Sequence, residues 1–245
     1  MKTCVVAYGG SIVIPGDAYD QRAMTELSDI LREYQDLRFV LIIGGGKLCR
    51  RVTSSIRPLL VDANLSSCEI DVANDEVGIA ITKVNARKVI SSLIEYLGDD
   101  IVYGEYIDNP EIIPNTKHRV FIASGFKPGV TTDFCMMRLA QNFGAETAYK
   151  ISNFPVVLNV KPTEFNSVLV DTYENISGIS WQGIVDLVGD TFIPGGNYPM
   201  DPPAAKLGLE ISQKINNFTL YVGQKEEFEK MLKQTEFIGT VIRNG

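Results

Sequence analysis

Two stretches of the sequence share one design, CVVAYGGS at residues 4–11 and RFVLIIGGGK at residues 38–47. In each, a short apolar run rich in β-branched residues leads directly into glycines, which is typical of a buried strand that ends in a tight loop. The apolar residues between the two stretches recur at helical spacing, at Met24, Leu27, Ile30 and Leu31. This succession predicts a strand, a helix and a second strand, the first β-α-β unit of the chain.

The same alternation continues to the end of the chain. Further strands are expected at residues 101–103, 120–123, 149–151, 156–160, 218–222 and 239–243. Helices are expected at residues 47–60, 76–97, 132–143, 179–188, 204–214 and 224–234. Alternating strands and helices favour an α/β fold, here a three-layer αβα sandwich with a central, mainly parallel sheet that binds ligands at the carboxyl ends of its strands. We expect residues 1–245 to form a single domain whose two lobes share this sheet.

The composition and the N-terminal residues indicate where in the cell the protein is expected. The chain is 45% apolar and 22% charged, as is ordinary for a globular protein. Its apolar runs fall far short of the roughly 20 residues that a membrane-spanning helix needs. The first residues lack the pattern of a signal peptide. We therefore expect a cytoplasmic protein with no membrane partner.

Charge and residue counts exclude several functions. The net charge of −7 argues against nucleic acid as a partner, because such binding depends mainly on lysine and arginine contacts to phosphates. The four cysteines form no close pair, which argues against a zinc motif or a dense disulfide framework. A single histidine, His118, leaves little for a histidine-based triad or a multi-histidine metal site. No metal-ligating residue is predicted.

The two glycine loops, residues 9–11 and 44–47, are candidate oxyanion sites. Backbone N–H groups without side chains in the way can wrap a phosphate, and the dipole of a following helix adds to the attraction. Two such loops suggest a polyphosphate, although tight strand-to-helix turns alone would also explain either one. Neither loop matches the Walker A pattern or the Rossmann fingerprint, which disfavours a P-loop kinase or a dehydrogenase.

The most specific stretch is SGFKPGVTTD at residues 124–133. It combines a glycine loop, two hydroxyls and a carboxylate at the start of a helix, which suits phosphate contacts and the orientation of a lysine. A simpler interpretation is that Thr131 or Thr132 only caps the helix. Lys206 belongs to a proline-started helix that would bring its ammonium group near the same edge of the sheet, unless it faces solvent. Arg50 is suited to clamping a phosphate, or else is an exposed helix residue.

Taken in order, these motifs resemble the amino acid kinase family over essentially the whole chain, and most closely its archaeal-type uridylate (UMP) kinases. The matching elements are Gly9-Gly10-Ser11, Gly44 to Lys47 with Arg50, Asp75 before a helix with the sequence ITKVNA at residues 81–86, Pro128 to Asp133, and Asp201 to Lys206. The resemblance implies a carbamate kinase-like fold with an acceptor-binding lobe at about residues 1–145 and a nucleotide-donor lobe at about residues 146–245.

The resemblance also implies roles for individual residues. The acceptor UMP would be held by Gly44, Gly45, Arg50, Thr131 and Thr132, with Asp75 reading its uracil or ribose. The donor ATP, bridged by Mg²⁺, would be held by Gly9, Gly10, Ser11 and Asn153. Asp133 would organise the reacting centre, and Lys206 would neutralise charge on the transferred phosphoryl group. The implied reaction is ATP-dependent phosphorylation of UMP to UDP by direct in-line transfer, in a homo-oligomer, usually a hexamer.

Two positions depart from the family pattern. Many relatives carry a lysine two residues before the first glycine loop, where this chain has Ala7. The donor-side pattern NVDGVYxxDP appears here as NFPVVLNVKP at residues 153–162. This second departure motivates one alternative, a regulatory or storage protein that binds a nucleotide or oxyanion without kinase activity. Another alternative is a kinase of a different acceptor, such as an amino acid, carbamate or an isoprenoid phosphate.

Overall fold

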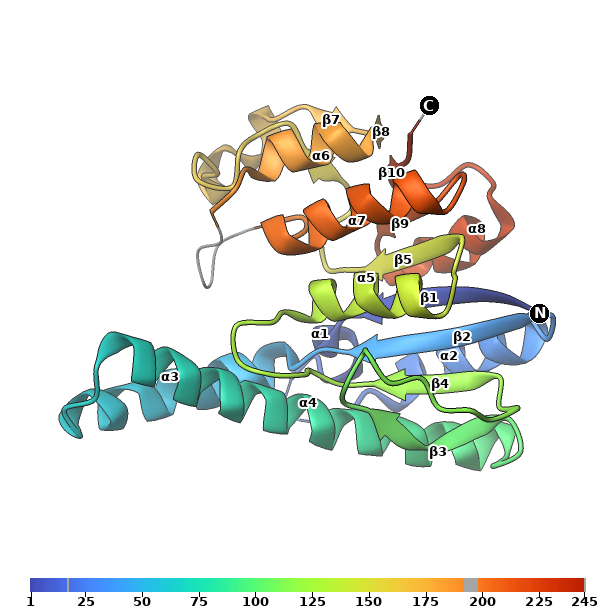
Figure 1. Cartoon of the computed structure of the whole chain (residues 1–245), viewed down its shortest axis with the longest axis horizontal. Helices are drawn as coiled ribbons and strands as arrows, with labels where there is room; N and C mark the ends of the chain where they lie inside the picture. The colour runs from blue at the N-terminus through green and yellow to red at the C-terminus, as the bar shows by residue number, and fades with distance from the viewer. Residues whose placement is uncertain (17, 192–197, 245) are drawn as a thin grey trace.

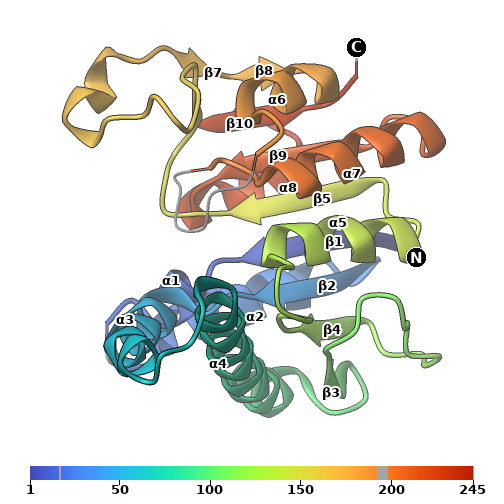
Figure 2. The same ribbon diagram turned by 60° about the vertical axis from the view of Figure 1, so that its left-hand side comes forward.

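Within residues 1–16, 18–191 and 198–244, which the computed structural model describes, eight strands form one sheet (Figures 1 and 2). In spatial order they are β3 (Val102–Ile107), β4 (Val120–Ala123), β2 (Leu37–Ile43), β1 (Lys2–Tyr8), β5 (Thr147–Ile151), β9 (Thr219–Gly223), β10 (Gly239–Ile242) and β8 (Gly178–Ile179). Neighbouring strands are parallel except β9 and β10. The expected α/β class with a mainly parallel central sheet is confirmed.

Helices cover both faces of this sheet. They are α1 (Gly10–Val13), α2 (Gln21–Glu33), α3 (Gly46–Asp62), α4 (Ser67–Leu97), α5 (Thr132–Asn142), α6 (Trp181–Val188), α7 (Pro202–Lys214) and α8 (Phe228–Lys233), with 3-10 turns η1 (Ser167–Thr172) and η2 (Lys225–Glu227). Two short strands, β6 (Val157–Leu158) and β7 (Asn175–Ile176), pair in a separate sheet. None of the described helices is long and apolar enough to cross a bilayer.

The alternation of side chains along each strand divides the core into two halves. Val5 and Ala7 of β1 pack on the side of α5, α6 and α7, whereas Val6 and Tyr8 pack on the side of α2, α4 and α8. Figures 1 and 2 show α5 and α7 on one side of the sheet and α2 and α8 on the other. The strands thus form the middle layer of a three-layer sandwich.

Some expected boundaries were wrong. The helix expected from residue 76 begins at Ser67, because Ser66 and Glu69 form a capping box that starts it earlier. The strand expected at residues 156–160 shrinks to β6 and does not join the central sheet, since the N–H of Val157 donates to the hydroxyl of Thr240 instead. The helix expected at residues 224–234 is divided into η2 and α8.

Helix α7 packs against α6 through a glycine. A Cβ atom at Gly208 would lie 2.1 Å from Cζ3 of Trp181. The indole ring cannot easily move away, because it is fully buried, stacks on Phe218 and donates its N–H to the carbonyl of Phe218 at 3.1 Å.

We therefore expect Gly208→Ala to lower the free energy of unfolding by about 1–3 kcal/mol through overpacking, although alanine favours helix. Urea denaturation measures this loss. The matched control is Gly104→Ala in β3, where no atom lies within 4 Å of the added Cβ atom. Equal stability of the two variants would contradict the packing argument.

Candidate active site

The loops that follow β1 and β2 touch each other backbone to backbone. The two strands are in register up to Tyr8 and Ile43, so their loops leave the sheet side by side. A Cβ atom at Gly10 would lie 2.2 Å from the carbonyl oxygen of Gly44, and one at Gly46 would lie 2.5 Å from the carbonyl carbon of Gly10. Gly46 also has a φ of +65°, which favours glycine. The guanidinium of Arg50 donates to the hydroxyl of Ser11 at 3.2 Å and ties the loops together.

Helix α4 anchors the loops that follow β2 and β4. The amide of the fully buried Asn85 donates to the carbonyl of Gly44 at 3.0 Å. One turn earlier, the hydroxyl of Thr82 accepts the N–H of Gly125 at 2.8 Å. The carboxylate of Asp75 accepts the N–H of Gly129 at 2.7 Å. Three side chains of one helix thereby hold the backbone of the loops after β2 and β4.

A cavity of about 360 Å³ opens at the carboxyl ends of β1, β2 and β5, lined by both glycine loops. The N-termini of α3 and α5 border it through residues 45–46 and 132–133, so both helix dipoles favour an anion there. Among the described residues of its lining, Arg50 and Lys150 contribute cations and Asp133 contributes a carboxylate. Burial raises the pKa of the Cys49 thiol, which therefore lines the cavity as a neutral group. This arrangement suits phosphate groups.

Lys150 and Asp133 form an ion pair inside this cavity. Asp133 lies in the first turn of α5, and Lys150 extends from β5 on the face that α5 covers. Their side chains are only 16% and 13% exposed. The pair joins a helix N-terminus to the middle of the sheet and holds an ammonium group beside the two glycine loops.

A second buried carboxylate lies next to this pair. Asp201 caps α7 by accepting the N–H of Ala204 at 2.9 Å, and it also accepts a hydrogen bond from the hydroxyl of Thr131. Thr131 in turn caps α5 by accepting the N–H of Phe134. The caps of α5 and α7 are thus bonded to each other. Burial raises the pKa of Asp201, and the neighbouring charge of Asp133 raises it further.

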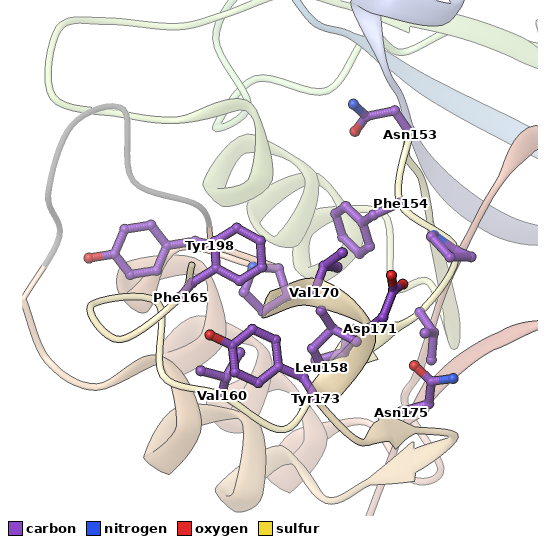
Figure 3. A pocket seen from close by; sticks show the side chains of 14 residues that line it. Asn153, Phe154, Leu158, Val160, Phe165, Val170, Asp171, Tyr173, Asn175 and Tyr198 are labelled. Carbon is purple, nitrogen blue, oxygen red and sulfur yellow. The ribbon is translucent and has the colours of Figure 1, made fainter. Parts of the chain in front are cut away.

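A larger cavity of about 510 Å³ adjoins the first (Figure 3). Its lining is mainly aromatic and aliphatic, from Phe154, Val157, Leu158, Val160, Phe165, Val170, Tyr173 and Tyr198, with Asp171 and Asn175 as polar groups. Asn153 lines both cavities. The segment at residues 153–162 that departs from the family pattern therefore forms a wall of a mainly apolar pocket, as ligand pockets commonly are.

Most of the expected site residues meet at the smaller cavity. Those that line it are Gly9, Gly10, Ser11, Gly44, Gly45, Arg50, Thr132, Asp133 and Asn153. Three described residues lie outside its lining. Thr131 is occupied as a helix cap, Asp75 holds the loop at Gly129, and Lys206 pairs with Asp190 at 2.7 Å with its side chain 47% exposed. The expected roles of these three residues in binding or catalysis stay predictions.

Sequence reasoning missed Lys150. A signal was present, because a lysine in the run TAYKI, at residues 147–151, interrupts an otherwise apolar strand. Asp201 and Asn85 were noticed only as parts of motifs. Their anchoring contacts join residues far apart in the chain and could not be read from local pattern.

The buried carboxyl of Asp201 predicts a pH dependence of stability. A raised pKa means that the folded state binds this proton more tightly than the unfolded state, whose carboxyl pKa is about 3.9. The contribution of the group to stability is therefore complete below that value and is lost as the pH rises through the folded pKa. We therefore expect the free energy of unfolding of Asp201→Asn minus that of the wild type, measured by urea titration, to increase from pH 4 to pH 7.

The control for this measurement is Asp190→Asn. Its hydrogen bond to Lys206 lowers the pKa of Asp190, so this exposed group contributes stability that is lost on acidification, the opposite direction. A difference between Asp201→Asn and wild type that stays flat with pH would contradict the prediction.

Comparison with known proteins identifies the family. A model of the amino acid kinase family matches residues 2–210. The protein named uridylate kinase of Archaeoglobus fulgidus is 28% identical over 97% of this chain and 98% of its own length. That of Methanococcus aeolicus is 26% identical over 97% of this chain and 98% of its own length.

Solved structures agree with this assignment. The crystal structure of the Archaeoglobus fulgidus uridylate kinase is 25% identical in sequence and superposes with a TM-score of 0.75, covering 99% of this chain and 100% of that one. A UMP kinase from Ureaplasma parvum, 16% identical with a TM-score of 0.69, shares the fold. Because the family model covers most of the sequence, the chain belongs to the amino acid kinase family.

Proposed function

We propose that this chain transfers the γ-phosphoryl group of ATP to UMP, which makes UDP and ADP. The observation that carries the proposal is the pair of adjoining cavities that share Asn153. One is lined by glycine loops, cations and helix N-termini, and the other by aromatic and aliphatic side chains. A donor nucleotide needs both environments, for its phosphates and for its base. The full-length relatives named uridylate kinase support UMP as the acceptor.

The residues of the smaller cavity would share the work as follows. Backbone N–H groups of Gly44 and Gly45, with Arg50 and Thr132, would hold the phosphate of UMP. The N–H of Gly10, with Ser11 and with Gly9 as the turn that leads into this loop, would hold the donor phosphates, since the N–H of Gly9 itself donates to the carbonyl of Ile151 at 3.2 Å. Asp133 would keep the reacting centre in order through Lys150. Transfer would be direct and in line, because phosphoryl transfer needs positioning and charge stabilisation more than a protein nucleophile.

Magnesium fits this site as a companion of the nucleotide. Among the described residues, no group of three or more ligating side chains is placed to hold a metal ion. Mg²⁺ commonly keeps several waters and takes one or two carboxylates together with substrate phosphates. Asp133 is the carboxylate near the phosphate loops. When bound, Mg²⁺ neutralises charge on the β- and γ-phosphates.

The division into an acceptor lobe at about residues 1–145 and a donor lobe at about residues 146–245 is part of this proposal. The smaller cavity draws on both halves, from Gly44 and Arg50 in the first and Lys150 and Asn153 in the second. The larger cavity is lined by residues after 150. A cytoplasmic setting is also proposed, supported by four cysteines that are all unpaired, as is usual in a reducing compartment.

The proposal is tested by an assay that couples ADP formation to UMP at saturating Mg·ATP, with calorimetry of UMP and of a non-hydrolysable ATP analogue taken separately. We expect UMP-dependent turnover and binding of both ligands. No turnover by the wild-type chain would contradict the proposal. Binding of UMP without binding of the ATP analogue would favour a nucleotide-binding protein without kinase activity.

A variant in the larger cavity sharpens this test. Leu158→Trp is expected to fill the space for the donor base and to raise the KM for ATP about tenfold or more, with the affinity for UMP within about threefold of wild type. The control is Ile112→Trp, at a side chain that is 65% exposed in another part of the fold. An unchanged KM for ATP would place the donor base elsewhere.

We also propose that the protein is a homo-oligomer that associates through α3 and the first half of α4. Figure 1 shows this helical pair extending beyond the sheet. None of residues 46–62, all of them described, is buried, and Leu59, Val61 and Val72 are 67%, 55% and 41% exposed. Exposed apolar side chains on a projecting pair of helices make this pair a candidate association surface. The family resemblance supports a second copy as the occupant, and dimers as the units of a hexamer.

Light scattering coupled to size exclusion tests the assembly at micromolar concentration. We expect Leu59→Glu to reduce the mass of the assembly, because a charge at the contact must be desolvated. Ile112→Glu, which changes a side chain of similar size and exposure, 65% against 67%, is the control and should leave the mass unchanged. A monomeric wild-type chain would rule out the assembly.

A further inference from the structure

The register of the sheet places Lys150 beside Ala7, the position where many members of the family carry a lysine. Lys150 of β5 pairs with Ala7 of β1. In-register residues of neighbouring parallel strands project from the same face, with the strands about 4.8 Å apart. Both residues line the glycine-rich cavity. Because Ala7 is uncharged, the ammonium group on this part of the cavity wall comes from Lys150.

The position of Lys150 is costly for a purely structural residue. Its neighbours along the strand, Tyr149 and Ile151, are 3% and 1% exposed, and its own side chain is 13% exposed. Burying a lysine and a carboxylate together is often no more stabilising than packing two apolar side chains in their place. A structural ion pair between α5 and β5 therefore does not by itself explain why a lysine stands at position 150.

The surroundings of the ammonium group are those of an anion site. The two glycine loops, the N-terminus of α5 and the guanidinium of Arg50 border the same cavity. Asp133 compensates the charge of Lys150 and fixes the direction of its side chain. By contrast, Lys206 is engaged by Asp190 and lies outside the lining that the described residues form.

We propose that Lys150 is the catalytic cation of the transfer, with its ammonium group on the oxygens of the phosphoryl group as it passes from donor to acceptor. This inference rests on the proposed function. In the reaction, a phosphate oxygen of UMP forms a bond to the γ-phosphorus of ATP. The bond from that phosphorus to the bridging oxygen breaks, and its electron pair leaves with ADP. Lys150 keeps its proton throughout and stabilises charge, and Asp133 positions it.

The test uses the full chain with Lys150→Met, which keeps the length of the side chain without its charge, and the double variant Ala7→Lys with Lys150→Met. The double variant moves the ammonium group to the adjacent strand on the same face of the sheet. Lys225→Met removes a lysine from another partly buried ion pair, with Glu26, and serves as the matched control. Thermal unfolding shows whether each variant folds.

We expect Lys150→Met to lower kcat about 100-fold or more, as the loss of a preorganised charge at a reacting centre does. Its affinities for UMP and for a non-hydrolysable ATP analogue should stay within about threefold of wild type. Mg·ADP, aluminium fluoride and UMP together mimic the transition state, because the fluoride complex takes the place of the transferring phosphoryl group. The affinity of the variant for this combination should fall sharply. The double variant should regain about tenfold or more in kcat. Lys225→Met should behave as wild type.

Several results would overturn the inference. These are a kcat of Lys150→Met close to that of wild type, a loss of transition-state-mimic binding no larger than the loss of UMP binding, and a double variant that binds both nucleotides without recovering activity. If Lys150→Met does not fold, the double variant alone decides, and failure of both to fold assigns the pair to stability and removes the inference. A wild-type chain without turnover would instead overturn the proposed function, and this inference with it.

Discussion

The close contact between the loops after β1 and β2 is the constraint on which the rest of the site depends. Gly10 and Gly46 meet at distances that leave no room for a Cβ atom on either residue. The contact follows from the sheet, because β1 and β2 are parallel, adjacent and in register to their last residues. It brings two sets of backbone N–H groups to one cavity, where charge would otherwise have to come from side chains.

A cavity whose backbone groups and helix N-termini suit an anion is also compatible with the acidity of the whole chain. A net charge of −7 would repel polyphosphates over the long range, but screening in salt weakens that field beyond about 10 Å. Within the cavity, the helix dipoles of α3 and α5 and two cations set the potential. Helix α4 fixes the loops after β2 and β4, because Asn85 bonds the carbonyl of Gly44 and Thr82 the N–H of Gly125.

The sequence predicted the layers of the fold and the two glycine loops that line the smaller cavity, because both follow from local patterns. Apolar runs that end in glycine located the strands and loops, and the carboxyl ends of parallel strands must share an edge. Lys150 was not predicted, because its place in the cavity follows from the pairing of β5 with β1 and from its contact with Asp133 at the start of α5. Lys206 was placed at the site by motif alone, and the structure shows its charge engaged by Asp190.

The altered segment at residues 153–162 shows why a missing motif is weak evidence for a missing pocket. Its glycine and aspartates are absent, yet Phe154, Val157 and Leu158 still turn inward, and residues from η1 and β7 close the other side. A flat base requires an apolar slot of suitable width. Many sequences can form such a slot, because dispersion and desolvation depend on area and shape more than on residue identity. Phosphates are more demanding, since their charge must be met by donors at fixed points. The end of the site lined by glycine loops therefore depends on those residues, whereas its apolar end can be built from many sequences, and Asn153 lines both cavities.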